Sequence, residues 1–163
     1  MKTLLEPECI CPNIDLKSWE GKTLSWKNKP FYMTKIMALF HMPIGFEGAV
    51  KKALAAIEKD YQKNEPFLML THHEGMFGAK VFFAVDESVH SGPGIETLSG
   101  TFVTKAFLGK DYSEAGKWAK ETVEYAKSKT GVEPKELYFW YANCPKCAKK
   151  QGGVKTVVFA KVD

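Results

Sequence analysis

The apolar and polar positions of this chain follow two periods, and each period predicts a different kind of element. A helical period, with apolar positions three or four residues apart, runs over residues 46–63. Its apolar stripe is Phe46, Val50, Ala53, Leu54, Ile57 and Tyr61. A second helix is predicted over residues 113–129, with the inner stripe Ala115, Trp118, Ala119, Thr122 and Ala126. Asp111 or Ser113 can cap its start, and Gly131 fits its end.

Strands are predicted in the apolar or alternating segments between turn residues. They cover residues 31–42, 67–74, 79–86, 96–109, 137–144 and 155–162. The order is therefore strand-helix-strand-strand, twice. Because neither half covers its own core, we expect an α+β fold in which one antiparallel sheet carries both helices on one face.

The remaining segments are predicted to be irregular. Residues 1–30 carry three prolines and a glycine, and we expect them to form an N-terminal arm on a single domain of residues 31–163. The stretch CPKCAKKQGG at 144–153 is predicted to be a loop between the last two strands.

Composition and charge narrow the function classes. The chain has 163 residues and a net charge of +4, and all 23 of its basic residues are lysine. Without arginine, the bidentate recognition of guanine and phosphate is missing, so we do not expect a nucleic-acid partner. No segment approaches the ~18 apolar residues of a membrane span, and no secretory signal is visible, which predicts a cytoplasmic protein.

Four consecutive aromatic residues, Tyr138 to Tyr141, lie in one predicted strand. Strand alternation puts Phe139 and Tyr141 on one face, and Tyr138 and Trp140 on the other. One set faces a binding cleft while the other packs in the core, or both sets are core, since buried sheets use aromatic residues on both faces.

Two segments resemble the GyrI-like family of small-molecule-binding domains. Leu108-Gly109-Lys110-Asp111-Tyr112 corresponds to the family's Gly-Pro-Tyr-like turn before a helix. Residues 138–145, YFWYANCP, correspond to its strand with a Tyr-Glu-x-Tyr core and an Asn/Asp-x-Pro end. Phe139 stands where that family has a glutamate.

The resemblance implies an aromatic-lined cleft between the two halves that binds hydrophobic or aromatic xenobiotics. Phe139 and Tyr141 would line it, with Tyr112 and Trp118 as further ligand-binding candidates. GyrI-like members serve as effector-binding domains of multidrug-sensing regulators, as stand-alone binders, and as hydrolases that open the cyclopropane ring of alkylating compounds. The resemblance implies a stand-alone version here.

A polar cluster, His72-His73-Glu74, lies at the end of a predicted strand. His72 and Glu74 share a face and His73 takes the other. His72 is therefore a ligand-binding candidate, and Glu74, together with Tyr141, is a catalytic candidate that could replace the missing glutamate. The alternative is a hairpin end at which polar residues meet water.

The four cysteines form two close pairs, Cys9 with Cys11 and Cys144 with Cys147. The number and the pairing of these cysteines fit a structural zinc ion with four thiolate ligands, which would hold the arm to the domain. A redox dithiol, disulfides and thiols without a role are the alternatives.

Three functions follow from these observations. The first is a small-molecule-binding protein with an aromatic cleft. The second is a hydrolase that uses the same cleft. The third is a zinc-stabilised interaction module without a small ligand.

Overall fold

A computed structural model describes residues 13–39, 42–44, 46–62, 68–75, 77–143 and 145–163. Its helices are α1 (Leu16–Trp19), α2 (Phe46–Asp60), the 3-10 turn η1 (Tyr112–Glu114), α3 (Ala115–Thr130) and α4 (Pro145–Gln151). Its strands are β1 (Thr23–Leu39), β2 (Met42–Ile44), β3 (Met69–Glu74), β4 (Gly78–Ala84), β5 (Ile95–Gly109), β6 (Glu136–Tyr141) and β7 (Val154–Lys161).

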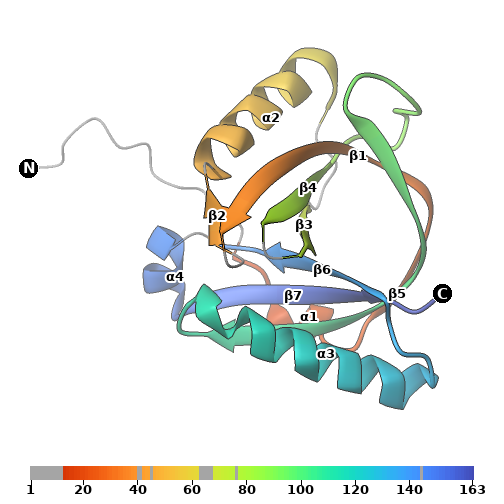
Figure 1. Cartoon of the computed structure of the whole chain (residues 1–163), viewed down its shortest axis with the longest axis vertical. Coiled ribbons are helices and arrows are strands. Elements are labelled where there is room, and N and C mark those ends of the chain that lie inside the picture. Colours follow the sequence, from red (N-terminus) through yellow and green to blue (C-terminus); the bar gives the residue numbers. More distant parts are fainter. Residues whose placement is uncertain (1–12, 40–41, 45, 63–67, 76, 144) are drawn as a thin grey trace, which may run out of the picture.

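The strands form one antiparallel sheet in the order β2-β1-β4-β3-β6-β7-β5. The first half of β1 also pairs with β5, from Thr23 opposite Val103 to Tyr32 opposite Ile95. This pairing closes six strands into a barrel, and β2 extends the far end of β1 as a short hairpin (Figure 1). The predicted α+β class with an antiparallel sheet is confirmed, whereas the closure was not predicted.

The length of β1 explains the closure. Its 17 residues allow one strand to pair with β5 along its first half and with β4 along its second half. A bulge between Trp26 and Lys29, with Asn28 at a φ of 51°, lies in the first half. Because bulges increase strand twist, this irregularity helps β1 to cross from one side of the barrel to the other.

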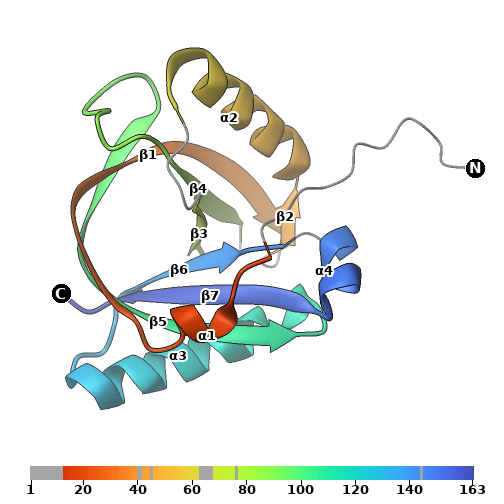
Figure 2. The same cartoon turned by 180° about the vertical axis from the view of Figure 1, so that it is seen from behind.

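The inner face of the barrel is a tightly packed aromatic and aliphatic core. Its buried members include Phe31, Leu70, Phe82, Phe102, Tyr138, Trp140, Val157 and Phe159. Helix α1 lies against β5 and β7 at one end (Figure 2), where Trp19 packs edge-on to Trp140 with ring centroids 5.1 Å apart. The strand residues at this end are therefore covered by the N-terminal segment.

Helices α2 and α3 pack on the outer face of the barrel. Ala53 and Ile57 of α2 lie against Val81 and Phe83 of β4. In α3 the buried residues are Trp118, Thr122 and Ala126, all members of the predicted stripe. Helix α3 ends at Gly131, whose φ of 75° suits glycine, as predicted.

Two predicted irregular segments contain regular structure. The second half of the predicted arm holds α1 and the start of β1, where Leu24 and Trp26 pack against the inner core. The predicted 144–153 loop holds α4, which begins at Pro145, a residue well suited to the first helical position. Among the described residues, no helix is long and apolar enough to cross a membrane.

Candidate functional site

The aromatic strand β6 presents different residues to the two faces of the barrel. Tyr138 and Trp140 belong to the inner core, while Phe139 packs in the outer core beside α3 together with Tyr141. This is the division that strand alternation predicts. Phe139 and Tyr141 therefore lie on the helix-bearing face of the sheet.

Four rings on this outer face contact one another, and we call His73, Tyr112, Phe139 and Tyr141 the outer aromatic cluster. Phe139 and Tyr141 are stacked, with centroids 5.7 Å apart and an interplanar angle of 14°. Tyr112 meets Tyr141 edge-on at 5.4 Å, and His73 meets Phe139 edge-on at 5.4 Å. Phe139 is buried, whereas the other three rings are partly exposed.

The seam between β3 and β6 brings His73 to this cluster. The two strands pair at only two positions, Leu70 opposite Trp140 and Thr71 opposite Phe139. His73 lies two residues beyond Thr71 on the same face, and its Nε2 is 3.2 Å from the hydroxyl of Tyr141. Strand alternation alone puts His73 on the face opposite His72 and assigns it no role, because the pairing of β3 with β6 is not visible in either strand by itself.

Tyr112 is held in place from both ends of its side chain. At the backbone, Asp111 accepts a hydrogen bond from the amide of Ser113, which caps the short turn η1. At the ring, the Tyr112 hydroxyl donates to the carbonyl oxygen of Asn143 at 2.5 Å. Because that bond uses the hydroxyl proton, the Tyr112 oxygen offers the site only its acceptor positions.

Asn143 is the fixed point of this arrangement, and its side chain is almost completely buried. Its Nδ2 donates to the carbonyl of Gly153 at 2.9 Å and to Gln151 Oε1 at 3.1 Å. Its Oδ1 accepts from the amide of Lys155 at 2.9 Å. The asparagine therefore ties the end of β6 to α4 and to the start of β7, and so fixes the partner of Tyr112.

Burial sets the protonation state of Tyr141. Removal from water raises the pKa of its hydroxyl well above the ordinary value of 10.0, and the nearby Tyr112 raises it further. Tyr141 is therefore a neutral phenol at pH 7. It donates to an unprotonated His73 Nε2, or accepts from a protonated one, so the pair can hold and move one proton.

Of the other predicted site residues, Trp118 lies in the same outer core as Phe139, whereas His72 and Glu74 lie on the inner face. Trp118 is buried in the outer core and stacks on Phe107, with centroids 5.7 Å apart. His72 lies on the inner face, where its ring stacks on Tyr138. Glu74 is exposed and pairs with Lys80 at 3.3 Å. The structure thus brings Tyr112, Phe139 and Tyr141 together and separates His72 and Glu74 from them.

The predicted zinc ligands are only partly within the described residues. Cys147 is buried in α4, while Cys9, Cys11 and Cys144 lie outside the part of the chain that the structure describes. Within that part, no three histidine, cysteine or acidic side chains gather in a metal-binding group.

A shallow groove of about 370 Å³ lies between β1 and α2, and it includes Ile36, Met37 and Ala49. Its lining shares no residue with the outer aromatic cluster. Its lining carries no histidine, tyrosine or acidic residue, so we place the candidate chemistry in the cluster and not in this groove.

Comparison with known proteins identifies the family and a similar solved fold. The solved structure of the EcmrR C-terminal domain superimposes with a TM-score of 0.58 at 11% sequence identity, covering 88% of this chain and 97% of that one. At this identity the likeness concerns the fold alone. No protein with a curated description matches the sequence. A family model described as "Bacterial hydrolase", which is not the GyrI-like model, matches residues 1–162, and the chain therefore belongs to this bacterial hydrolase family.

Proposed function

We propose that the protein binds a flat hydrophobic or aromatic small molecule against the outer aromatic cluster. The observation that carries the proposal is the packing of Tyr112, Phe139 and Tyr141 beside one another, with the two tyrosine rings partly exposed. Aromatic faces held in fixed orientations bind planar groups by stacking. The resemblance to GyrI-like domains supports the same site, and with it the expectation of two strand-helix-strand-strand halves with a cleft between them.

Binding is tested by titrating the protein with acridine orange, a flat aromatic dye, and following the quenching of tryptophan fluorescence. Tyr141→Leu removes one stacking face and is expected to weaken binding about tenfold, since an aromatic contact contributes about 1.5 kcal/mol at most beyond its buried area. Tyr125→Leu, a change of the same kind in α3, is the matched control and should leave binding unchanged. Equal affinity in the Tyr141 variant and the wild type would contradict the proposal.

A second candidate function is hydrolysis at the same site. It is favoured by the 3.2 Å contact between His73 Nε2 and the Tyr141 hydroxyl, and by the description of the family. In this proposal the Tyr141 hydroxyl passes its proton to His73 Nε2 and takes a proton from water as the water oxygen bonds to an electrophilic carbon of the ligand. The electron pair of the bond that breaks leaves with the departing group. If a cyclopropane ring opens, the pair stays in the ligand's conjugated system instead. In either case the proton held by His73 is then returned to the group that received the pair.

Turnover of a p-nitrophenyl ester, followed by absorbance, separates the two catalytic assignments. If His73 is the general base, His73→Gln should lower kcat at least a hundredfold. Glu74→Gln, which changes an exposed residue on the inner face, should leave kcat within twofold. The opposite result would favour the assignment that the sequence suggested, in which Glu74 acts with Tyr141. Binding of the dye without turnover of the ester would support the binding function and contradict the hydrolase function.

The structural zinc remains a proposal that rests on the cysteine pairs alone. Elemental analysis of freshly purified protein should find about one zinc per chain, and Cys147→Ser together with Cys144→Ser should remove it. Less than about half an equivalent of any metal in the wild type would exclude the four-cysteine site, and with it the zinc-stabilised interaction module.

A further inference from the structure

The inner face of the barrel carries a second group of ionisable side chains, at the strand ends remote from α1. Each of the six barrel strands contributes one residue, and we call the set the barrel-mouth ring. Its members are Lys35 of β1, Lys80 of β4, His72 of β3, Glu136 of β6, Lys161 of β7 and Glu96 of β5. The ring is separate from the outer aromatic cluster, because the sheet lies between them.

Register and alternation place these residues on the inner face. Lys35 lies directly opposite Lys80, and Lys80 lies directly opposite His72, so three basic residues form a row across three neighbouring strands. Two residues along β4 from Lys80, Phe82 belongs to the inner core. On β7, Phe159 of the inner core precedes Lys161 by two residues.

Contacts fix the orientation of His72 in this ring. Its Nδ1 is 3.0 Å from the carbonyl oxygen of Leu137. Since a carbonyl oxygen only accepts, Nδ1 carries the hydrogen, and Nε2 of the neutral ring is left as an acceptor. The ring stacks on Tyr138 at 5.0 Å, and the Tyr138 hydroxyl donates to Glu136 Oε2 at 3.0 Å.

Within the part of the chain that the structure describes, not every charged residue of the ring has an ion-pair partner, inside or outside the ring. Lys80 pairs with Glu74, and Lys161 lies 3.9 Å from Glu136. Among the described residues, Lys35 and Glu96 have no ion-pair or hydrogen-bonding partner. Glu96 lies opposite Phe31, four residues before Lys35 on β1, so the two backbones are roughly 13 Å apart along the strand.

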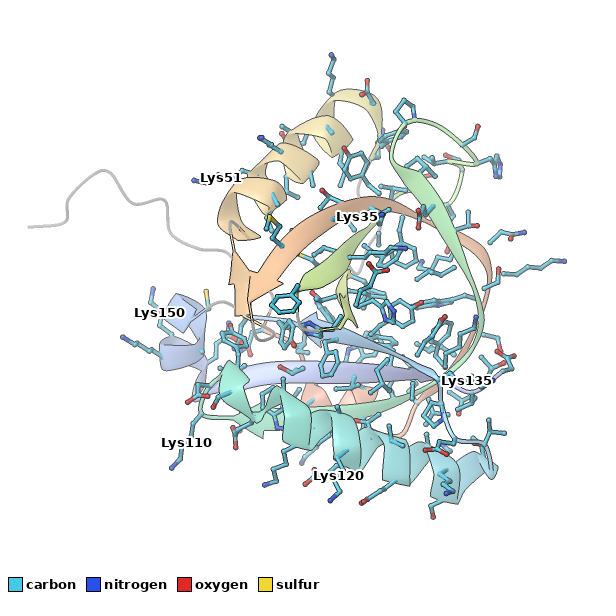
Figure 3. All side chains as sticks on the ribbon, viewed as in Figure 1. Lys35, Lys51, Lys110, Lys120, Lys135 and Lys150 are labelled. Carbon is cyan, nitrogen blue, oxygen red and sulfur yellow. The ribbon has the colours of Figure 1, made fainter. Side chains whose placement is uncertain are left out.

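The space between these two charges has an apolar base. Along the inner side of β1, Met33 lies between Lys35 and Phe31, the residue opposite Glu96. The Met33 side chain packs against the inner core and remains partly exposed. Lys35 (Figure 3) and Glu96 are themselves exposed, so both charges are accessible from solvent.

We propose that the barrel-mouth ring binds a peptide-like zwitterion of two or three residues. Lys35 takes the carboxylate, Glu96 takes the ammonium group, and Met33 contacts an apolar side chain between them. An extended peptide spans at most ~3.6 Å per residue, so two or three residues cover the part of the ~13 Å separation that the two side chains leave open. Alternating residues of the same strands thus serve two sites, one on each face of the sheet.

The experiment uses the tripeptide Ala-Phe-Ala, titrated into the full chain and followed by the ring proton resonances of the histidines. The resonances of His72 are expected to shift, and those of His73 on the outer face are not. Acetylation of the peptide's amino group, or amidation of its carboxyl group, should each weaken binding about two- to fivefold, the range expected for an exposed ion pair.

Two variants assign the charges, and each has a matched control on α3. Lys35→Met should abolish the effect of amidation, and Glu96→Gln should abolish the effect of acetylation. Lys120→Met (Figure 3) and Glu124→Gln change exposed residues of the same types and should alter nothing. No shift at His72 with 10 mM peptide, equal binding of the capped peptides, or shifts at His73 in place of His72 would each overturn the proposal. Because acridine orange tests the outer cluster, the two proposals can fail independently.

Discussion

The most direct test of the arrangement around the candidate site is to replace Asn143 by alanine. Its side chain is 2% exposed and makes three hydrogen bonds, to the Gly153 carbonyl, to Gln151 Oε1 and from the Lys155 amide. Each such bond contributes about 1 kcal/mol net, and the buried groups left behind lose their partners. We therefore expect Asn143→Ala to lower the free energy of unfolding by about 3 kcal/mol. For a chain of this size, that corresponds to a fall in Tm of about 6–12 °C.

The assay is urea unfolding followed by circular dichroism, with a thermal scan beside it. Gln62→Ala, which removes an exposed amide, is the control and should stay within ~0.5 kcal/mol of the wild type. Asn143→Asp sharpens the test, because it keeps the acceptor for Lys155 but turns a carboxylate oxygen toward the Gly153 carbonyl. Burial beside a carbonyl raises the pKa of this carboxyl group in the folded chain, so the variant's deficit relative to the wild type should shrink as the pH falls and be smallest below about pH 4, where the protonated group donates. A loss of less than about 1 kcal/mol in Asn143→Ala would refute the reasoning.

Two further predictions concern backbone strain and alkaline pH. Gly94→Ala should lower the free energy of unfolding in urea by about 1–3 kcal/mol, because the φ of Gly94 is 77° and a Cβ there would lie 2.6 Å from Tyr32. Gly116→Ala, in open space on α3, is the control and should raise it by about 0.5–1 kcal/mol. Equal effects of the two substitutions would contradict this prediction. Burial raises the pKa of Tyr141 in the folded chain above its unfolded value, so the stability it contributes is complete below pH 10 and is lost as the pH rises beyond it. Tyrosinate absorbance at 295 nm should therefore show a fraction that titrates only with unfolding, and this fraction should decrease in Tyr141→Phe.

Local patterns in the sequence determined the elements and the faces of the aromatic strand. The helical period predicted α2 and α3, and the stripe of α3 contains all three of its buried residues. Strand alternation separated Phe139 and Tyr141 from Tyr138 and Trp140. These features depend on neighbouring residues only, so each can be recognised within one segment.

Only the tertiary structure decided which strands pair, and with them the composition of both candidate sites. Alternation showed that His72 and His73 point to opposite faces, but the contact of His73 with Tyr141 depends on the pairing of β3 with β6, 68 to 70 residues apart. The closure of the barrel depends in the same way on the pairing of β1 with β5. The alternation of apolar and polar side chains along a strand is the same whichever strand it pairs with, because the backbone groups of any strand in register can form the hydrogen bonds. The packing of the whole core decides which strands pair. The sequence therefore predicted the aromatic members of the outer aromatic cluster, but not His73 beside them.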